Sequence, residues 1–123
     1  MKKIVLIEDD SFYVQEFRDE IKGRFELIHF SSPSDFVDKD LDLNDVEAVF
    51  LDFDFGHVSE KENMLAEYLR KEKAFKGKVV LWSLLEEFDR ETKLYLDAFC
   101  DDIWVKRDLS LEKIKKLLTN HGD

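Results

Sequence analysis

Short apolar runs alternate with amphipathic segments along the whole of this sequence. The apolar runs are rich in Val, Ile, Leu and Phe, which is typical of strands that are buried within a sheet. The run Val49-Phe50-Leu51 ends in Asp52, and Gly56 then breaks the pattern, as expected where a buried strand ends. The predicted strands cover residues 4–7, 25–30, 47–53, 79–82 and 103–105.

Between the strands, apolar side chains recur at the three- and four-residue spacing of a helix. This spacing predicts helices over residues 12–22, 60–74 and 89–99, a short helix from Pro33 or Ser34 through Val37, and a last helix capped by Ser110. In the first helix, Ser11 is the predicted N-cap, Gly23 the terminator, and the inward side chains Val14, Phe17 and Ile21. In the helix over 89–99, the inward side chains are predicted to be Leu94, Tyr95 and Ala98.

The alternation of strands and helices determines the expected fold class. Five repeats of this pattern predict a parallel sheet covered by helices on both faces. Right-handed crossovers favour a doubly wound arrangement with the first strand at its centre. We therefore expect an α/β, flavodoxin-like (βα)5 fold with strand order 2-1-3-4-5, formed by residues 1–123 as a single domain.

Composition limits the kinds of partner that the protein can bind and the cellular compartments that it fits. The net charge of −10 argues against binding to nucleic acid or to an anionic membrane surface. The single cysteine, Cys100, excludes an intramolecular disulfide and fits a reducing compartment. We find no stretch of membrane-spanning length and no signal peptide before the first strand, so we expect a cytoplasmic protein.

Polar side chains stand where four of the predicted strands end. Glu8 and Asp9 follow the first strand, Asp52 closes the third, Ser83 the fourth, and Lys106 follows the fifth. Taken singly, each of these residues fits an ordinary turn or surface position. In the expected strand order, the carboxyl ends of strands one and three are neighbours, so the carboxylates should converge where open α/β sheets bind ligands.

The order and types of these residues resemble the receiver domain of two-component response regulators. The matching stretches are KKIVLIEDD, AVFLDFDFG, KVVLWS and DDIWVK, and the resemblance covers essentially the whole chain. It implies that a sensor histidine kinase or a phosphotransfer protein donates a phosphoryl group to Asp52 in a bacterial phosphorelay. It also implies a Mg²⁺ ion, because crowded carboxylates repel one another unless a cation lies between them. The implied metal ligands are Glu8, Asp9, Asp52 and the backbone carbonyl of Asp54.

The resemblance also assigns roles to the later strand ends. Lys106 would supply a positive charge, and Ser83 a hydroxyl, to the phosphoryl oxygens. Ser83 and Ile103 correspond to the two residues that switch position on phosphorylation. The sequence departs from the family pattern at four positions, and these departures bear on switching and phosphorylation rate rather than on the fold. They are Gly56 and Arg107, where the family has proline, Leu84 in place of a small residue, and Ile103 in place of an aromatic one.

Three functions are compatible with these observations. The first is a stand-alone response regulator, expected because the chain stops after its fifth helix, that signals by binding an unidentified downstream protein and has at most self-phosphorylation and self-dephosphorylation chemistry. The second is a pseudo-receiver that binds a partner without being phosphorylated, an interpretation favoured by Leu84 and the missing prolines. The third is a phosphatase of the haloacid-dehalogenase type, because Asp52-Phe53-Asp54 resembles the nucleophile and acid of that family. The acid pair at Glu8 comes too early in the chain for this third class.

Overall fold

Five parallel strands form one sheet in the order β2-β1-β3-β4-β5, which confirms the predicted topology. A computed structural model describes the backbone of residues 1–52 and 60–119, and the side chains of 1–52 and 65–119. The strands are β1 (Lys3–Ile7), β2 (Glu26–Phe30), β3 (Val46–Asp52), β4 (Lys78–Ser83) and β5 (Asp102–Val105).

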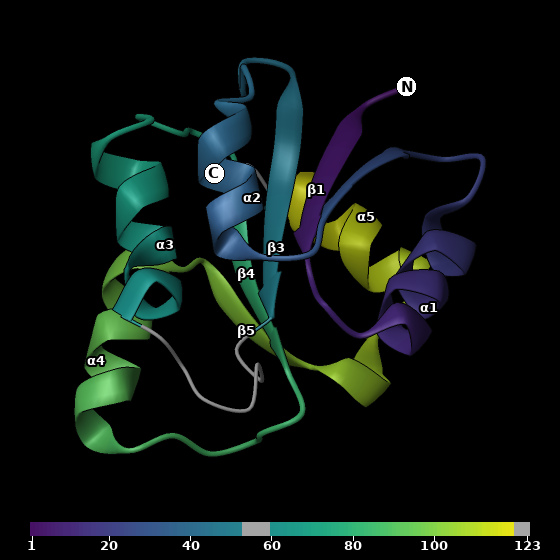
Figure 1. The fold of residues 1–123 in the computed structure, drawn as a ribbon. Helices are drawn as coiled ribbons and strands as arrows, with labels where there is room; N and C mark the ends of the chain where they lie inside the picture. The colour runs from purple at the N-terminus through teal and green to yellow at the C-terminus, as the bar shows by residue number, and fades with distance from the viewer. Residues whose placement is uncertain (53–59, 120–123) are drawn as a thin grey trace.

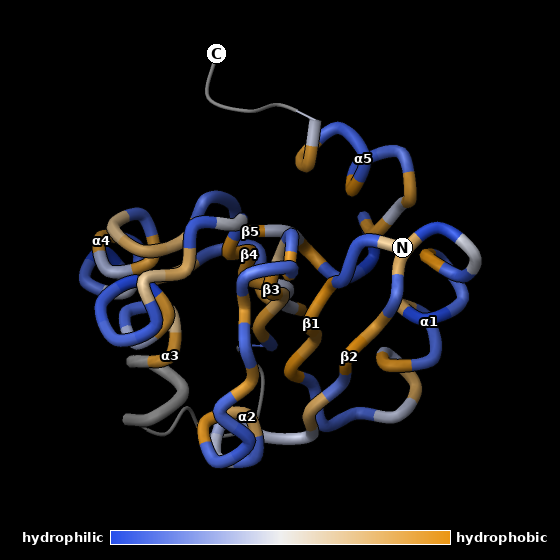
Figure 2. The backbone as a smooth tube through the Cα atoms, turned by 90° about the horizontal axis from the view of Figure 1, so that it is seen from above, coloured by the Kyte–Doolittle hydropathy of each residue, from blue (hydrophilic) through white to orange (hydrophobic). Residues whose placement is uncertain are grey.

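The helices cover both faces of this sheet (Figure 1). They are α1 (Ser11–Ile21), α2 (Pro33–Lys39), α3 (Glu60–Lys71), α4 (Arg90–Phe99) and α5 (Leu111–Thr119), and a 3₁₀ turn spans Lys106–Asp108. Helices α1 and α5 lie on one face and α2, α3 and α4 on the other, as Figures 1 and 2 both show. In Figure 2 the strands form the hydrophobic centre and the helices turn hydrophilic segments outward.

Alternation along each strand divides the core into two clusters, one on each face of the sheet. In β1, Ile4 and Leu6 pack toward α1 and α5, whereas Val5 and Ile7 pack toward α2, α3 and α4. The same alternation runs through β3 and β4, because successive side chains of a strand point to opposite faces. The sheet is thus buried on both faces, as its apolar runs predict.

Two sequence-based details of the helices are wrong. Asp10, not Ser11, is the N-cap of α1, because its side chain accepts a hydrogen bond from the Phe12 backbone N–H at 2.9 Å. Leu94 and Ala98 are exposed rather than inward, and Leu96 is the buried residue of α4. Helix α4 is rotated so that Tyr95, Leu96 and Phe99 meet the core.

Other boundaries differ by a few residues. Helix α3 ends at Lys71 rather than Ala74, which adopts a left-handed φ of 50° in the following loop. Gly77 is required in that loop, because a Cβ there would lie 2.4 Å from the Phe75 ring and 2.6 Å from the Glu47 carbonyl oxygen. Gly23, with φ of 79°, follows α1 as predicted, and Ser110 caps α5 by accepting from the Lys113 N–H at 3.1 Å.

Arg70 joins the loops that precede β4 and β5. Its guanidinium donates hydrogen bonds to the carbonyl oxygens of Phe75 and Gly77, both at 2.8 Å, and of Phe99 at 3.3 Å. It also pairs with Asp101 at 2.6 Å, and the same carboxylate oxygen accepts from the Val79 N–H at 2.8 Å. One half-buried side chain therefore ties the ends of α3 and α4 to the start of β4 and β5.

We expect Arg70→Met to lower the free energy of unfolding by about 2 kcal/mol, because three charge-assisted hydrogen bonds to part-buried carbonyls are lost together. Urea denaturation followed by circular dichroism measures this loss. Lys93→Met is the matched control, since its ion pair with Asp97 is exposed and should contribute less than about 0.5 kcal/mol. Equal losses in the two variants would contradict the role given to Arg70.

Candidate functional site

The residues at the strand ends converge at the carboxyl edge of the sheet, as their order along the chain predicts. Glu8, Asp52, Ser83 and Lys106 are the buried polar or charged residues in the part of the chain whose side chains are described. The strand register accounts for this convergence. Ile7 pairs with Leu51 and Ser83 with Val105, so Glu8 falls beside Asp52, and Lys106 falls beside the end of β4.

The ammonium group of Lys106 lies between two buried carboxylates. Its Nζ is 2.6 Å from Oε1 of Glu8 and 3.1 Å from Oδ1 of Asp52. The second oxygen of Glu8, Oε2, accepts a hydrogen bond from the Asp10 backbone N–H at 3.0 Å. The His29 ring nitrogen Nε2 lies 2.7 Å from the Glu8 carbonyl oxygen, which fixes the end of β1 against β2. The site is therefore held by residues of β2 and β3 and by residues that directly follow β1 and β5.

Asp9 completes a group of three carboxylates. One oxygen each from Glu8, Asp9 and Asp52 lies within 4.8 Å of the others, and Asp9 is exposed while the other two are buried. Oxygen ligands at this spacing on the open side of a site suit Mg²⁺, which keeps several of its waters. These three residues thus fit the predicted metal. The fourth predicted ligand, the backbone carbonyl of Asp54, lies outside the described residues, as does Gly56.

Burial and charge shift the titration of this cluster. Burial raises the pKa of Glu8 to about 8, and the nearby Asp52 charge raises it as well, although the hydrogen bond from Lys106 opposes the shift. Burial acts to lower the pKa of Lys106, but the hydrogen bond and charge of Glu8 and the charge of Asp52 outweigh it, so that this pKa is raised. The ammonium is thus charged and stabilises carboxylates that would otherwise be costly to bury.

Two aromatic rings that sequence reasoning did not assign to the site also contact Lys106. Its Nζ lies 4.3 Å from the centroid of the Tyr13 ring and 5.3 Å from that of Trp82. Trp82 precedes Ser83 in β4, but Tyr13 lies on α1, five residues after Glu8. In the sequence, Tyr13 is marked only by its place directly before the inward residue Val14. That position does not reveal that its ring contacts Lys106.

The two predicted switch residues occupy different environments. Ser83 is fully buried, and its hydroxyl oxygen accepts a hydrogen bond from the Leu85 N–H at 2.9 Å. Ile103 is half-buried and packs against the core on the α2–α4 face. Their movement on phosphorylation stays a prediction.

Two of the positions that depart from the family pattern lie around a hollow beside the site. Leu84 is 52% exposed, so its side chain extends toward solvent rather than filling the site. Arg107, in place of the usual proline, forms an ion pair with Glu86 from the β4–α4 loop. Leu84, Arg107, Phe12 and Tyr13 line a hollow of about 350 Å³ that reaches Lys106.

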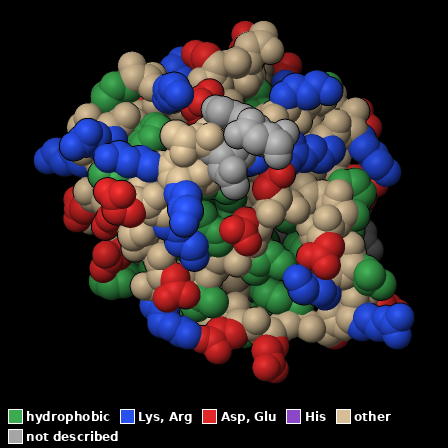
Figure 3. Space-filling view, turned by 180° about the vertical axis from the view of Figure 1, so that it is seen from behind, with side chains coloured by type: hydrophobic (Ala, Val, Ile, Leu, Met, Phe, Trp, Pro, Cys, Tyr) green, Lys and Arg blue, Asp and Glu red, His purple; other side chains and the backbone are tan. Residues whose placement is uncertain are grey.

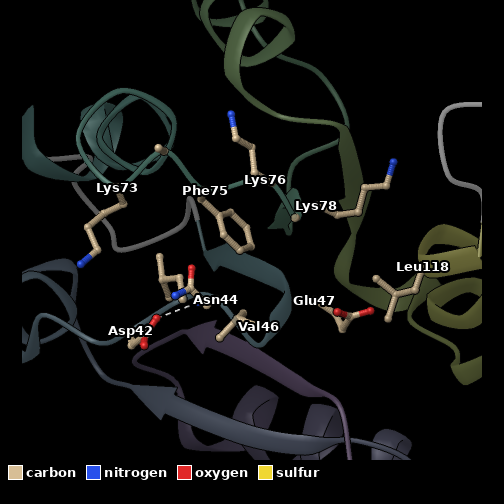
Figure 4. Close-up of a pocket in the computed structure, with 12 residues that line it drawn as sticks. Asp42, Asn44, Val46, Glu47, Lys73, Phe75, Lys76, Lys78 and Leu118 are labelled. Atoms are coloured by element: carbon tan, nitrogen blue, oxygen red, sulfur yellow. Dashed lines mark hydrogen bonds between the residues drawn. The ribbon is translucent and has the colours of Figure 1, made fainter.

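A second hollow of about 410 Å³ lies at the opposite, amino-terminal edge of the sheet (Figure 4). The Phe75 ring points into it, and its rim carries both lysines and carboxylates, including Lys76, Lys78 and Glu47. On the face of the molecule shown in Figure 3, side chains of the two signs are likewise intermixed. Among the described helices, none combines the length and the apolar composition that crossing a membrane requires.

Comparison with known proteins identifies the fold. No family model and no curated protein matches the sequence. The BeF3-activated receiver domain of DrrB, a Thermotoga maritima protein, is 20% identical, with 98% of this chain and 99% of that chain covered at a TM-score of 0.75. TrrA from the same organism, solved with Mg²⁺ and BeF, is 23% identical over 96% of this chain and 100% of that chain, with a TM-score of 0.73.

A two-component response regulator from Clostridium difficile is 19% identical over the whole of both chains, with a TM-score of 0.77. These neighbours confirm the flavodoxin-like fold in the form that receiver domains have. At identities this low, the similarity establishes the fold and leaves the function to be argued from the site.

Proposed function

We propose that this protein is a response-regulator switch that accepts a phosphoryl group on Asp52. The observation that carries the proposal is the position of the Asp52 carboxylate, 3.1 Å from the Lys106 ammonium and within 4.8 Å of the carboxylates of Glu8 and Asp9. A nucleophilic carboxylate flanked by a fixed positive charge and by metal-ligand oxygens is the arrangement that phosphoryl transfer requires.

In the proposed reaction, an oxygen of Asp52 attacks the phosphorus atom of the donor. A P–O bond to Asp52 forms while the bond from phosphorus to the leaving group breaks, and the leaving group departs with the electron pair. Lys106 and the hydroxyl of Ser83 then contact the phosphoryl oxygens. Mg²⁺, held by Glu8, Asp9 and Asp52, would neutralise the charge that the phosphoryl group brings to this acidic site.

The phosphodonor is proposed to be a histidine kinase or a phosphotransfer protein, and the output to be the binding of a downstream protein. Support for this proposal comes from the receiver domains that share the fold over nearly the whole chain, combined with the residues at the strand ends.

Intact-protein mass spectrometry with acetyl phosphate and Mg²⁺ tests the proposal. We expect a stable gain of one phosphoryl group. An unchanged mass would instead favour a pseudo-receiver, and steady hydrolysis of the donor would favour a phosphatase. Chelation of the metal should prevent the gain, because the acidic cluster alone repels the donor.

We expect millimolar Mg²⁺ to raise the melting temperature, since a ligand at about a hundredfold excess over its dissociation constant stabilises the folded state by about 2.7 kcal/mol. Asp9→Asn should reduce this effect but hardly change the stability without metal, because Asp9 is exposed. The matched control is Asp38→Asn, the same substitution at an exposed position of α2. A melting temperature that does not respond to Mg²⁺ would contradict the metal assignment.

A further inference from the structure

The ammonium group of Lys106 is surrounded by Glu8, which directly follows β1, and by residues of α1, β3 and β4. Its side chain is only 2% exposed. Glu8 and Asp52 form ion pairs with it, and the rings of Tyr13 and Trp82 lie over it at 4.3 and 5.3 Å. A lysine so deeply buried has lost its hydration. Attraction between the ammonium and the negative face of an aromatic ring compensates for part of the hydration energy that is lost.

The Tyr13 ring is itself held in a fixed orientation. It meets the Trp82 ring edge to face, with centroids 5.9 Å apart, and the Phe12 ring at 5.1 Å. Trp82 in turn packs edge to face on Phe17, at 5.2 Å, in the core beneath α1. The aromatic contact on Lys106 is therefore anchored in the core on the α1 side of the sheet.

We propose that Tyr13 is a positioning residue of the phosphoryl site and acts through Lys106. The proposal rests on the function proposed above for Asp52. Lysine is a point charge on a flexible four-carbon stem, so its position depends on what surrounds the ammonium. Once a phosphoryl group is attached to Asp52, the ammonium has to face the phosphoryl oxygens as well as Glu8. The Tyr13 ring limits where it can move.

The test compares Tyr13→Leu with Tyr13→Phe, which keeps the ring, and with Tyr68→Leu, the same substitution at a half-buried tyrosine of α3 on the opposite face of the sheet. The affinity for beryllofluoride in the presence of Mg²⁺ is measured by calorimetry, together with the affinity for Mg²⁺ alone. We expect Tyr13→Leu to weaken beryllofluoride binding about tenfold, as a cation–π contact of average strength would. Tyr13→Phe and Tyr68→Leu should stay within about twofold of the parent, and Mg²⁺ affinity should not change.

A double-mutant cycle separates positioning from a general effect on folding. In a Lys106→Met background, Tyr13→Leu should cause no further loss of beryllofluoride affinity, because the group through which it acts is gone. An equal loss in both backgrounds, or an equal loss with Tyr68→Leu, overturns the proposal.

The Lys106 side chain provides a readout that does not depend on phosphorylation. In the parent protein and in Tyr13→Phe, ring currents should shift the NMR signals of the Lys106 ε-methylene group, and Tyr13→Leu should remove most of that shift. If the parent protein binds no beryllofluoride, the proposed function is contradicted. The NMR comparison then tests separately whether the Tyr13 ring lies over the Lys106 side chain. A shift that is the same in all variants overturns the inference itself.

Discussion

Asp52→Asn is expected to abolish the uptake of a phosphoryl group from acetyl phosphate. The amide nitrogen and oxygen that replace the carboxylate are poor nucleophiles, and one of the three carboxylates of the metal group is lost as well. Intact-protein mass spectrometry should show the gain of one phosphoryl group in the parent protein and an unchanged mass in the variant. The Lys106 ammonium keeps its 2.6 Å contact with Glu8, so the variant should remain folded.

Asp54→Asn is the informative control, because it makes the same change two residues further along the chain. It should still take up one phosphoryl group and alter only how long the group persists. A mass gain in Asp52→Asn, located at Asp54 by peptide mapping, would show that the phosphoacceptor has been assigned to the wrong carboxylate.

Lys106→Met should cause the largest loss of stability of any substitution considered. It leaves Glu8 and Asp52 buried without their shared cation, and breaking a buried ion pair by removing one partner costs about 3–5 kcal/mol. Chemical denaturation in the presence of a metal chelator measures this loss. Mg²⁺ should recover part of it, because the cation takes over the neutralisation of the carboxylates.

The loss should also depend on pH. The pKa of Glu8 is raised to about 8, above its ordinary value of 4.5, so the folded protein binds a proton more tightly than the unfolded chain does. The contribution of Glu8 to the free energy of unfolding therefore falls as the pH rises from 4.5 to about 8. Without the Lys106 hydrogen bond, which lowers this pKa, the fall should be larger in total and extend to higher pH. Glu8→Gln combined with Lys106→Met should be more stable than Lys106→Met alone at pH 9, and a double variant that is no more stable would contradict this account.

The sequence determined the fold and the positions of the site residues along the chain. Apolar runs and helical spacing are local properties, and five alternations of strand and helix leave few ways to bury all the apolar faces. The ends of the apolar runs located Glu8, Asp52, Ser83 and Lys106, because buried strands tolerate such side chains only where they end. Local patterns were less precise at helix ends, where Ser11 and Asp10 are both good N-cap residues.

The orientation of a helix about its own axis was decided by tertiary packing. In α4, Leu94 and Leu96 are equally apolar, and the sequence offers no local reason to prefer one of them. The structure buries Leu96, which packs in the core cluster on the face of the sheet that α2, α3 and α4 cover, and leaves Leu94 61% exposed. Which leucine is inward depends on how α4 packs against its neighbours. The spacing of apolar residues along α4 does not determine this packing.

Only the tertiary structure decided how Lys106 is held. Sequence reasoning expected a lysine directed at phosphoryl oxygens, whereas the folded chain gives it two carboxylates and two aromatic rings as neighbours. These partners come from separate elements, and their contacts depend on strand register and on side-chain rotamers. No local pattern encodes such contacts. Tyr13 and Lys106 are far apart in the sequence, and the alignment of β1, β3, β4 and β5 and the packing of α1 on the sheet bring them together.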